Sequence, residues 1–344
     1  MSFDLRHRKN HNEINEISEE SYELIKTTFE GNSERFVQIG PNKYIERDFY
    51  EKYKDEFYNF EVKNDDIWVI TLPRSGTTVT QEMIWQIMNN MDLKNEIPLI
   101  ERYTFLESGT FFSHSFVNEL VETNKGDGKK CETIKKLFTP AWQQNIPGPR
   151  FFKSHMPLSL LPPELLSSGC KIIYVARNPK DMLVSRYNFK KMYGDQLPKT
   201  FELFWNLLEK GLVTPTPFWQ HIQEAWQLKD TKNLLFLFYE DLVQKPEKTI
   251  SKTSTFLNKN LSQEQISKLA DHLNVDNFKN NPSVNRDYYD YVGNKSSQCN
   301  FVRRGKVDGW KDELFSSELA ERADAWIQEN YRKYGFRFPN IPMI

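Results

Sequence analysis

Four short apolar runs interrupt an otherwise polar chain. They are the segments 67–72 (IWVITL), 151–155 (FFKSH), 171–176 (KIIYVA) and 234–239 (LLFLFY). Each has the length of a strand that is buried on both faces. Helical patterns lie between or after them: apolar residues recur at helical spacing from Val79 to Met91, and Ser262 with Gln265 forms a capping box ahead of another helix. This alternation predicts an α/β fold with a central, mainly parallel sheet flanked by helices.

The start and the middle of the chain lack such clear patterns. Residues 1–20 are polar with almost no periodicity, so we expect a poorly ordered tail followed by a single domain over residues 21–344. Between residues 95 and 150 the pattern weakens, although bulky aromatic residues stay frequent. Long irregular insertions usually have a function, and the aromatics favour a cover over a binding pocket. A small helical subdomain with only a packing role is the alternative.

The charge balance limits the classes of partner. The 46 Lys and Arg residues against 47 Asp and Glu residues give a net charge of -1, which disfavours a general binder of nucleic acid or membrane surfaces. The three cysteines, at positions 131, 170 and 299, have no metal-ligand spacing. No apolar run approaches ~18 residues, and the start has no apolar signal-peptide core. We therefore expect a soluble, cytoplasmic protein without a bound metal.

The first apolar run leads into a loop suited to phosphate. The sequence PRSGTT at residues 73–78 joins the predicted strand to the following amphipathic helix, a geometry that aims backbone N–H groups and the positive helix end at an anion. Gly76 permits a tight turn, and Arg74 adds a positive charge. Hydroxyl donors come from Ser75, Thr77 and Thr78. The lysine and the leading glycine of a nucleoside-triphosphate loop are missing, which disfavours ATP or GTP chemistry. A helix start capped by Ser or Thr is the simpler alternative.

The second run carries a candidate catalytic pair. Lys153 and His155 are two residues apart on a predicted strand, so both side chains leave the same face of the sheet. A histidine beside a cation at a strand end is a candidate general base with a charge stabiliser next to it. An ordinary structural histidine is the alternative, since most histidines have no catalytic role.

Two further basic positions complete the set. Arg177 follows the third run and is expected at the carboxyl edge of the sheet, where open α/β sheets bind ligands. Near the end of the chain, Arg303, Arg304 and Lys306 surround Gly305 in a second basic loop, which is able to hold a phosphate. Taken alone, this loop also fits an exposed basic turn.

These motifs, in their order and spacing, resemble the cytosolic sulfotransferase family. The resemblance rests on the phosphate loop, the K-x-H-x-P strand, Arg177 with Ser185 in RNPKDMLVSRYNF, and the R-R-G loop. It runs from about Phe36 to the last predicted helix near Tyr334. It is closest to insect members, among them the retinol dehydratase type, through the segments GLVTPTPFWQHIQEAW and LFLFYEDL.

The resemblance implies metal-free transfer of a sulfuryl group from 3'-phosphoadenosine 5'-phosphosulfate (PAPS) to a hydroxyl or amine, leaving 3'-phosphoadenosine 5'-phosphate (PAP). The implied acceptor is small and largely apolar, such as a phenol, steroid or retinoid-like alcohol, with the segment 95–150 covering its pocket. His155 is implied as the general base, and Lys153 and Arg74 as catalytic charge stabilisers. The implied donor-binding residues are Arg74, Ser75, Gly76, Thr77 and Thr78 at the phosphosulfate, Arg177, Ser185, Arg303, Arg304 and Gly305 at the 3'-phosphate, and Val79 and Tyr239 near the adenine.

The chain departs from the family pattern at several positions. Arg74 replaces the usual lysine, and Val79 and Val275 stand where aromatic residues would enclose the adenine, so we expect an under-filled adenine pocket. The family's dimer motif is not met after Lys311, and the usual homodimer is therefore not implied. Two other functions stay open. One is an inactive protein of this fold that binds PAP or an apolar ligand, and the other is a nucleotide phosphotransferase.

Overall fold

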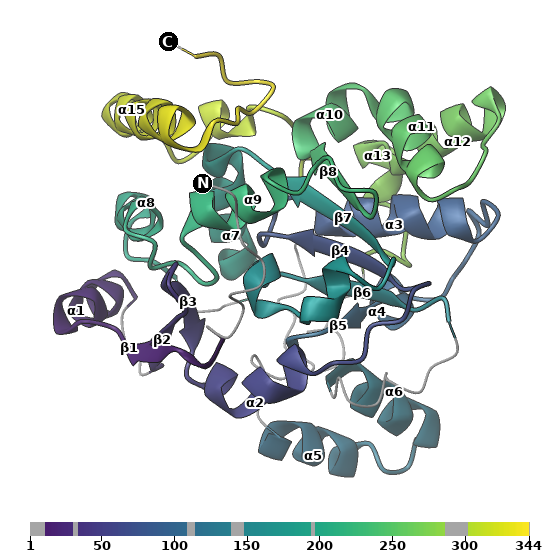
Figure 1. Ribbon diagram of the computed structural model, residues 1–344, viewed down its shortest axis with the longest axis horizontal. Coiled ribbons are helices and arrows are strands. Elements are labelled where there is room, and N and C mark those ends of the chain that lie inside the picture. The colour runs from purple at the N-terminus through teal and green to yellow at the C-terminus, as the bar shows by residue number, and fades with distance from the viewer. Residues whose placement is uncertain are drawn as a thin grey trace.

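The computed structural model describes residues 11–29, 34–108, 114–138, 148–193, 197–285 and 302–343. At its centre is a parallel five-stranded sheet with the strand order β5-β6-β4-β7-β8 (Figure 1). The strands are β4 (Ile67–Thr71), β5 (Thr104–Phe105), β6 (Phe151–Ser154), β7 (Lys171–Ala176) and β8 (Leu234–Phe238). The four predicted strands and the α/β class are thereby confirmed. Within this sheet only β5 was not predicted, because a strand of two residues shows no pattern.

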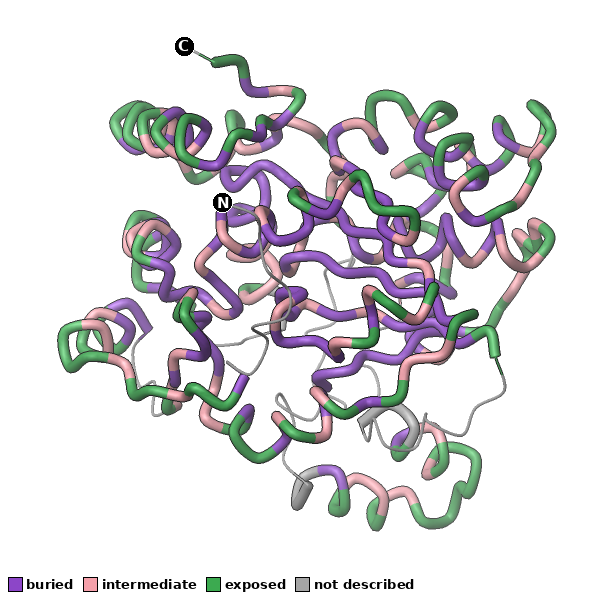
Figure 2. Tube along the Cα trace, in the orientation of Figure 1, coloured by how far each residue is buried: buried purple, intermediate pink, exposed green. Residues whose placement is uncertain are grey.

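Alternate residues of each strand pack into two different cores. Trp68, Phe152 and Tyr174 belong to the larger hydrophobic cluster, whereas Val69 and Ile173 belong to the second cluster. Both faces of the sheet are therefore covered, which explains why the strands read as continuous apolar runs. In Figure 2 the strands are buried along most of their length, while the outer helices alternate between buried and exposed residues.

Helices cover the two faces of the sheet. The second cluster joins the sheet to α3, α11, α12 and α13, which group together in Figure 1, and the larger cluster joins it to α2, α7, α8, α9 and α15. The described helices are α1 (Glu19–Thr28), α2 (Phe49–Tyr58), α3 (Thr77–Met88), α4 (Leu99–Arg102), α5 (His114–Thr123), α6 (Gly128–Phe138), α7 (Pro179–Tyr193), α8 (Phe201–Glu209), α9 (Phe218–Trp226), α10 (Tyr239–Gln244), α11 (Pro246–Phe256), α12 (Gln263–Leu273), α13 (Val275–Phe278) and α15 (Ser317–Tyr334). Short 3-10 turns lie at η4 (Leu158–Leu160), η5 (Pro163–Leu166) and η6 (Gly309–Asp312). The capping box of Ser262 and Gln265 begins α12, as predicted.

The second half of the expected tail contains secondary structure. Residues 14–16 form β1 (Ile14–Glu16), which pairs with β2 (Phe36–Ile39), and β2 pairs with β3 (Tyr44–Arg47) in an antiparallel sheet of three strands. Backbone hydrogen bonds hold β1 in place. Because these bonds do not depend on the side chains, the short polar sequence INE gave no pattern that predicts a strand. Residues 1–10 lie outside the described residues.

The segment 95–150 is more regular than expected. Its described part contains α4, β5, α5 and α6. Residues 109–113 and 139–147, where some of the aromatic residues fall, lie outside the described residues. In the part of the chain that the structure describes, no helix is long and apolar enough to cross a membrane.

Candidate functional site

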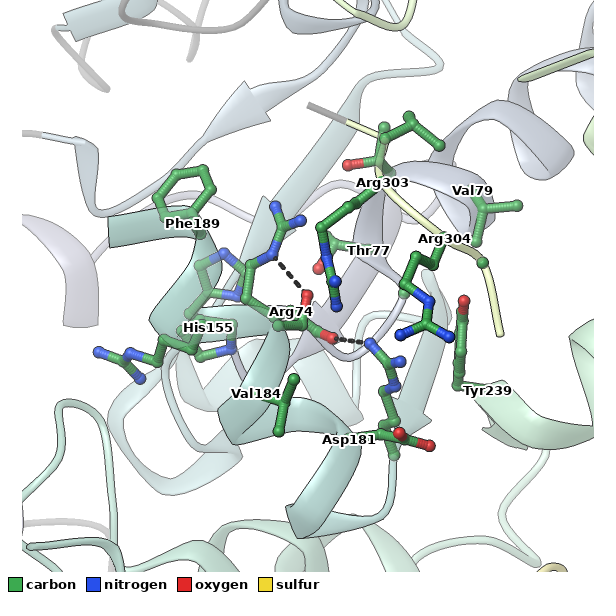
Figure 3. A pocket seen from close by; sticks show the side chains of 18 of the residues that line it. Arg74, Thr77, Val79, His155, Asp181, Val184, Phe189, Tyr239, Arg303 and Arg304 are labelled. Carbon is green, nitrogen blue, oxygen red and sulfur yellow. Dashed lines mark hydrogen bonds between the residues drawn. The ribbon is translucent and has the colours of Figure 1, made fainter. Parts of the chain in front are cut away.

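A cavity of about 650 Å³ opens at the carboxyl ends of β4, β6, β7 and β8 (Figure 3). It brings together nearly all the site residues expected from the sequence. Those that line it are Arg74, Gly76, Thr77, Thr78, Val79, Lys153, His155, Arg177, Ser185, Tyr239, Arg303, Arg304 and Gly305. Ser75 is the exception, because its side chain is fully buried beneath the loop. No cluster of metal-ligating side chains occurs within the described ranges.

The phosphate loop connects β4 to α3 in a strained conformation. Gly76 has a φ of 98° and Arg74 a φ of 68°, and such positive values favour glycine. The Thr71 hydroxyl at the end of β4 lies 2.7 Å from that of Thr77 at the start of α3, which ties the two ends of the loop together. Among the described residues, the buried hydroxyl of Ser75 has no hydrogen-bond partner. The residues at the start of α3 do line the cavity, and the free N–H groups of a helix N-terminus fit an anion.

Arg177 links this loop to Tyr239 across the cavity. Its Nη1 donates to the carbonyl oxygen of Arg74 at 2.9 Å, and its guanidinium carbon lies 4.3 Å from the centre of the Tyr239 ring. Its Nε is buried and has no hydrogen-bond partner in the described part of the chain. Arg177 therefore keeps a donor available to a ligand while its plane is already oriented.

Arg74 points along α7 rather than across the loop. Its Nε donates to Ser185 Oγ at 3.2 Å, and its guanidinium carbon lies 4.7 Å from the centre of the Phe189 ring (Figure 3). Both contacts use the flat guanidinium, whose planar shape a lysine does not have. Phe189 was not expected from the sequence, although it lies four residues after Ser185 on the same helix face.

Acidic neighbours hold the second basic loop. Arg303 and Arg304 donate to Glu313 at 2.8 and 2.7 Å, and Arg304 also donates to Asp312 at 2.8 Å. Lys306 donates to the same Asp312 oxygen at 2.6 Å. The sequence analysis missed these carboxylates, although Asp312 and Glu313 closely follow the loop. A bound phosphate would compete with them for the guanidinium groups.

The ring of His155 is held by β4 and stays neutral. Its ring Nδ1 lies 2.8 Å from the carbonyl oxygen of Thr71. Burial, followed by the positive charge of Lys153, lowers the pKa of His155 to about 3, so the imidazole is neutral at ordinary pH. Since a carbonyl oxygen only accepts hydrogen bonds, Nδ1 carries the proton and Nε2 is the basic nitrogen.

The far end of the cavity contains two acids that the sequence did not reveal. Glu46 comes from β3 and Glu107 follows β5, and both line the cavity although each is almost fully buried. Burial raises the pKa of Glu107 to about 7 and that of Glu46 to about 8. Neither element was predicted, so no pattern could have placed these carboxyl groups near His155.

The part of the cavity where the sequence analysis expects the adenine is mostly aliphatic. Val79 and Val275 both line it. A β-carbon on Gly305 would lie 2.7 Å from Cβ of Val275, so this valine packs directly on the glycine of the basic loop. The remaining apolar lining on this side comes from Leu242, Val243, Pro246, Ala270, Leu273 and Phe278.

Comparisons with known proteins agree with this geometry. The sulfotransferase domain family matches residues 64–335. The chain is 33% identical to sulfotransferase 1A1 of Mus musculus over 282 residues, covering 80% of this chain and 88% of that protein. It is 29% identical to luciferin sulfotransferase of Photinus pyralis over 327 residues, covering 92% of this chain and 85% of that protein. A solved structure of retinol dehydratase, in complex with androsterone and PAP, shares 32% identity and a TM-score of 0.84 over 95% of this chain and 98% of that chain.

Proposed function

The chain belongs to the sulfotransferase family, and from this premise we propose that it sulfonates a small, largely apolar acceptor that carries a hydroxyl or amine group. The observation that carries the proposal is the neutral His155, whose basic nitrogen shares one cavity with the phosphate loop. The co-substrate is PAPS, since PAP is bound in the related structures.

The residues on the donor side fit two phosphate groups. Arg177 lines the cavity, and its buried Nε has no hydrogen-bond partner in the described part of the chain, which fits a bound anion there. We assign the phosphosulfate to the loop from Arg74 to Thr78, because its amides and the start of α3 converge there. We assign the 3'-phosphate to Arg177, Ser185 and the loop from Arg303 to Gly305.

The proposed reaction is a direct transfer. Bound PAPS supplies an activated sulfuryl group. Nε2 of His155 takes the proton of the acceptor hydroxyl as the acceptor oxygen bonds to sulfur, and the bond from sulfur to the bridging phosphate oxygen breaks. Lys153, Arg74 and the loop amides stabilise the negative charge that grows on that oxygen. The products are a sulfate ester, PAP and the proton held by His155.

The acceptor side supports a largely apolar molecule. Phe105 and Phe189 line the cavity near His155, and the ring centre of Phe105 is 5.4 Å from that of His155. Related structures hold retinol or androsterone together with PAP. Phe105 belongs to the segment 95–150, which we propose as the cover of the acceptor pocket. We also propose a cytoplasmic location, as for the cytosolic family members that the chain resembles.

Turnover of radiolabelled PAPS against a panel of phenols, steroid alcohols, allylic alcohols and amines tests this function. We expect label transfer to at least one hydroxyl compound, with PAP formed in equal amount. Tight PAP binding without transfer to any acceptor would support the inactive alternative. Transfer of a phosphoryl group from ATP under the same conditions would support a phosphotransferase.

A further inference from the structure

Three hydrogen bonds hold His155 from three different parts of the fold. Its backbone N–H donates to Glu107 Oε1, and its ring Nδ1 donates to the carbonyl oxygen of Thr71 at 2.8 Å. Its own carbonyl oxygen lies 2.9 Å from Nε2 of His221, a residue of α9 that is 66 positions away. The main chain and the ring of His155 are therefore fixed separately.

The hydrogen atoms of His221 follow from its partners. A carbonyl oxygen only accepts, so Nε2 of His221 must donate to His155. Nδ1 of His221 is then the acceptor, and the hydroxyl of Tyr174 on β7 donates to it at 2.7 Å. His221 is completely buried, and burial lowers its pKa to about 4, so the ring stays neutral and keeps this arrangement.

We propose that His221, oriented by Tyr174, is a positioning residue that holds the backbone of His155 so that the imidazole faces the acceptor. The proposal rests on the function proposed above, in which His155 is the base. Neither His221 nor Tyr174 is among the described residues that line the cavity, whereas His155, Lys153 and Glu107 are. His221 therefore acts only through His155, and it does not touch a substrate.

Position is important here because the hydrogen bond to Thr71 leaves a single ring nitrogen for the reaction. A displacement of the backbone at residue 155 moves the ring away from Thr71 and away from the acceptor together. Misplacement of a reacting group by about 1 Å can cost on the order of a hundredfold in rate. The sequence analysis gave His221 no role, because its partners lie on β7 and just beyond β6.

Three variants and one control separate positioning from general stability. His221→Leu removes the donor to His155, whereas His221→Gln keeps an N–H donor and an oxygen acceptor at similar reach. Tyr174→Phe removes only the hydroxyl that orients His221. Tyr331→Phe is the matched control, because this buried hydroxyl accepts a hydrogen bond from the backbone N–H of Phe338, away from the cavity.

For each variant we would measure kcat, the KM of each substrate, PAP affinity and thermal unfolding. We expect His221→Leu to lower kcat by about tenfold or more with PAP affinity within about twofold, and His221→Gln to recover most of that loss. Tyr174→Phe should lower kcat several-fold, and Tyr331→Phe should not change it. An unchanged kcat in a folded His221→Leu variant would overturn the proposal.

A double substitution tests the route of the effect. If His221 acts through His155, then His221→Leu should change the residual rate of His155→Ala by less than about twofold. An equal loss in both backgrounds would show a structural role instead, and would overturn the proposal.

The imidazole NMR signals of His155 provide a readout that needs no turnover. We expect one Nδ1–H tautomer in the parent protein and a mixture of tautomers, or a broadened ring signal, in His221→Leu. The same single tautomer in both proteins would contradict the positioning role. The parent protein and His221→Leu could differ in tautomer as expected while the parent transfers no sulfuryl group from PAPS. That result would refute the proposed function and leave the positioning role intact.

Discussion

The ring of Tyr239 occupies the space that a side chain at position 76 would need: a β-carbon on Gly76 would lie 2.5 Å from Cδ2 of Tyr239. Gly76 also has a φ of 98°, a backbone angle that residues with a side chain rarely adopt. Two separate constraints thus make residue 76 a glycine, one from the loop and one from the ring that Arg177 covers at 4.3 Å.

We therefore expect Gly76→Ala to weaken PAP binding by about tenfold or more, because either the ring or the loop must move. Calorimetry with PAP measures the loss. Tyr239→Ala in the same chain removes the steric conflict but keeps the positive φ, so Gly76→Ala should cost less in that background. A larger cost there would contradict the contact as the cause.

The 3'-phosphate should dominate donor recognition. Arg177, Arg303 and Arg304 line one region of the cavity, and each charge-assisted hydrogen bond contributes about 1.5 to 3 kcal/mol. We expect PAP to bind about a thousandfold more tightly than AMP, which lacks that phosphate. Arg304→Gln should weaken PAP by about tenfold and leave AMP unchanged. Equal calorimetric affinities for PAP and AMP would rule out this assignment.

The adenine pocket is expected to have room for a larger side chain at position 79. Val79 lines the cavity and is only partly buried. Val79→Trp should tighten PAP binding by about 1 kcal/mol through stacking on the base. AMP carries the same adenine, so its binding should tighten by the same amount. In the Arg304→Gln experiment, by contrast, only the affinity for PAP should change. Unchanged or weaker binding of both nucleotides would show that the aliphatic lining already fills the pocket.

The positive charge of Arg74 should act mainly in the transition state. Arg74→Met removes that charge and should lower kcat by about 10² to 10³, with Arg74→Lys keeping substantial turnover. The lysine variant keeps the charge but not the flat guanidinium that contacts Ser185 and Phe189, so it separates charge from guanidinium shape. Steady-state kinetics measures both. A loss confined to the KM of the donor would make Arg74 a binding residue, with Lys153 stabilising the leaving group.

Lys153 should control the protonation of His155 in the free enzyme. Its positive charge is the second cause, after burial, of the lowered pKa of His155. Lys153→Met should therefore raise that pKa, because repulsion of the imidazolium is removed while burial remains. If the neutral ring acts as the base, as proposed above, the acid-side fall of kcat/KM should begin at higher pH in the variant. NMR titration of the His155 ring measures the shift, and a lower pKa would contradict this cause.

The local sequence pattern was sufficient to predict the strands and loops that carry the site. The apolar runs predicted β4, β6, β7 and β8, because strands buried on both faces must be continuously apolar. The parallel order then brings the ends of these strands to one edge. The loop around Gly76, the pair Lys153 and His155, and Arg177 all lie there, as the sequence analysis expected.

Tertiary structure alone decided what surrounds these residues. Glu107 reaches His155 from 48 positions away and His221 from 66, and both contacts involve the backbone of His155, which no side-chain pattern records. Glu46 arrives on the antiparallel sheet of β1 to β3, whose first strand is polar and is held by backbone hydrogen bonds. The pattern of apolar residues along the sequence therefore determined which residues lie at the edge of the sheet. Long-range backbone hydrogen bonds and burial decided how His155 is oriented and which charges surround it.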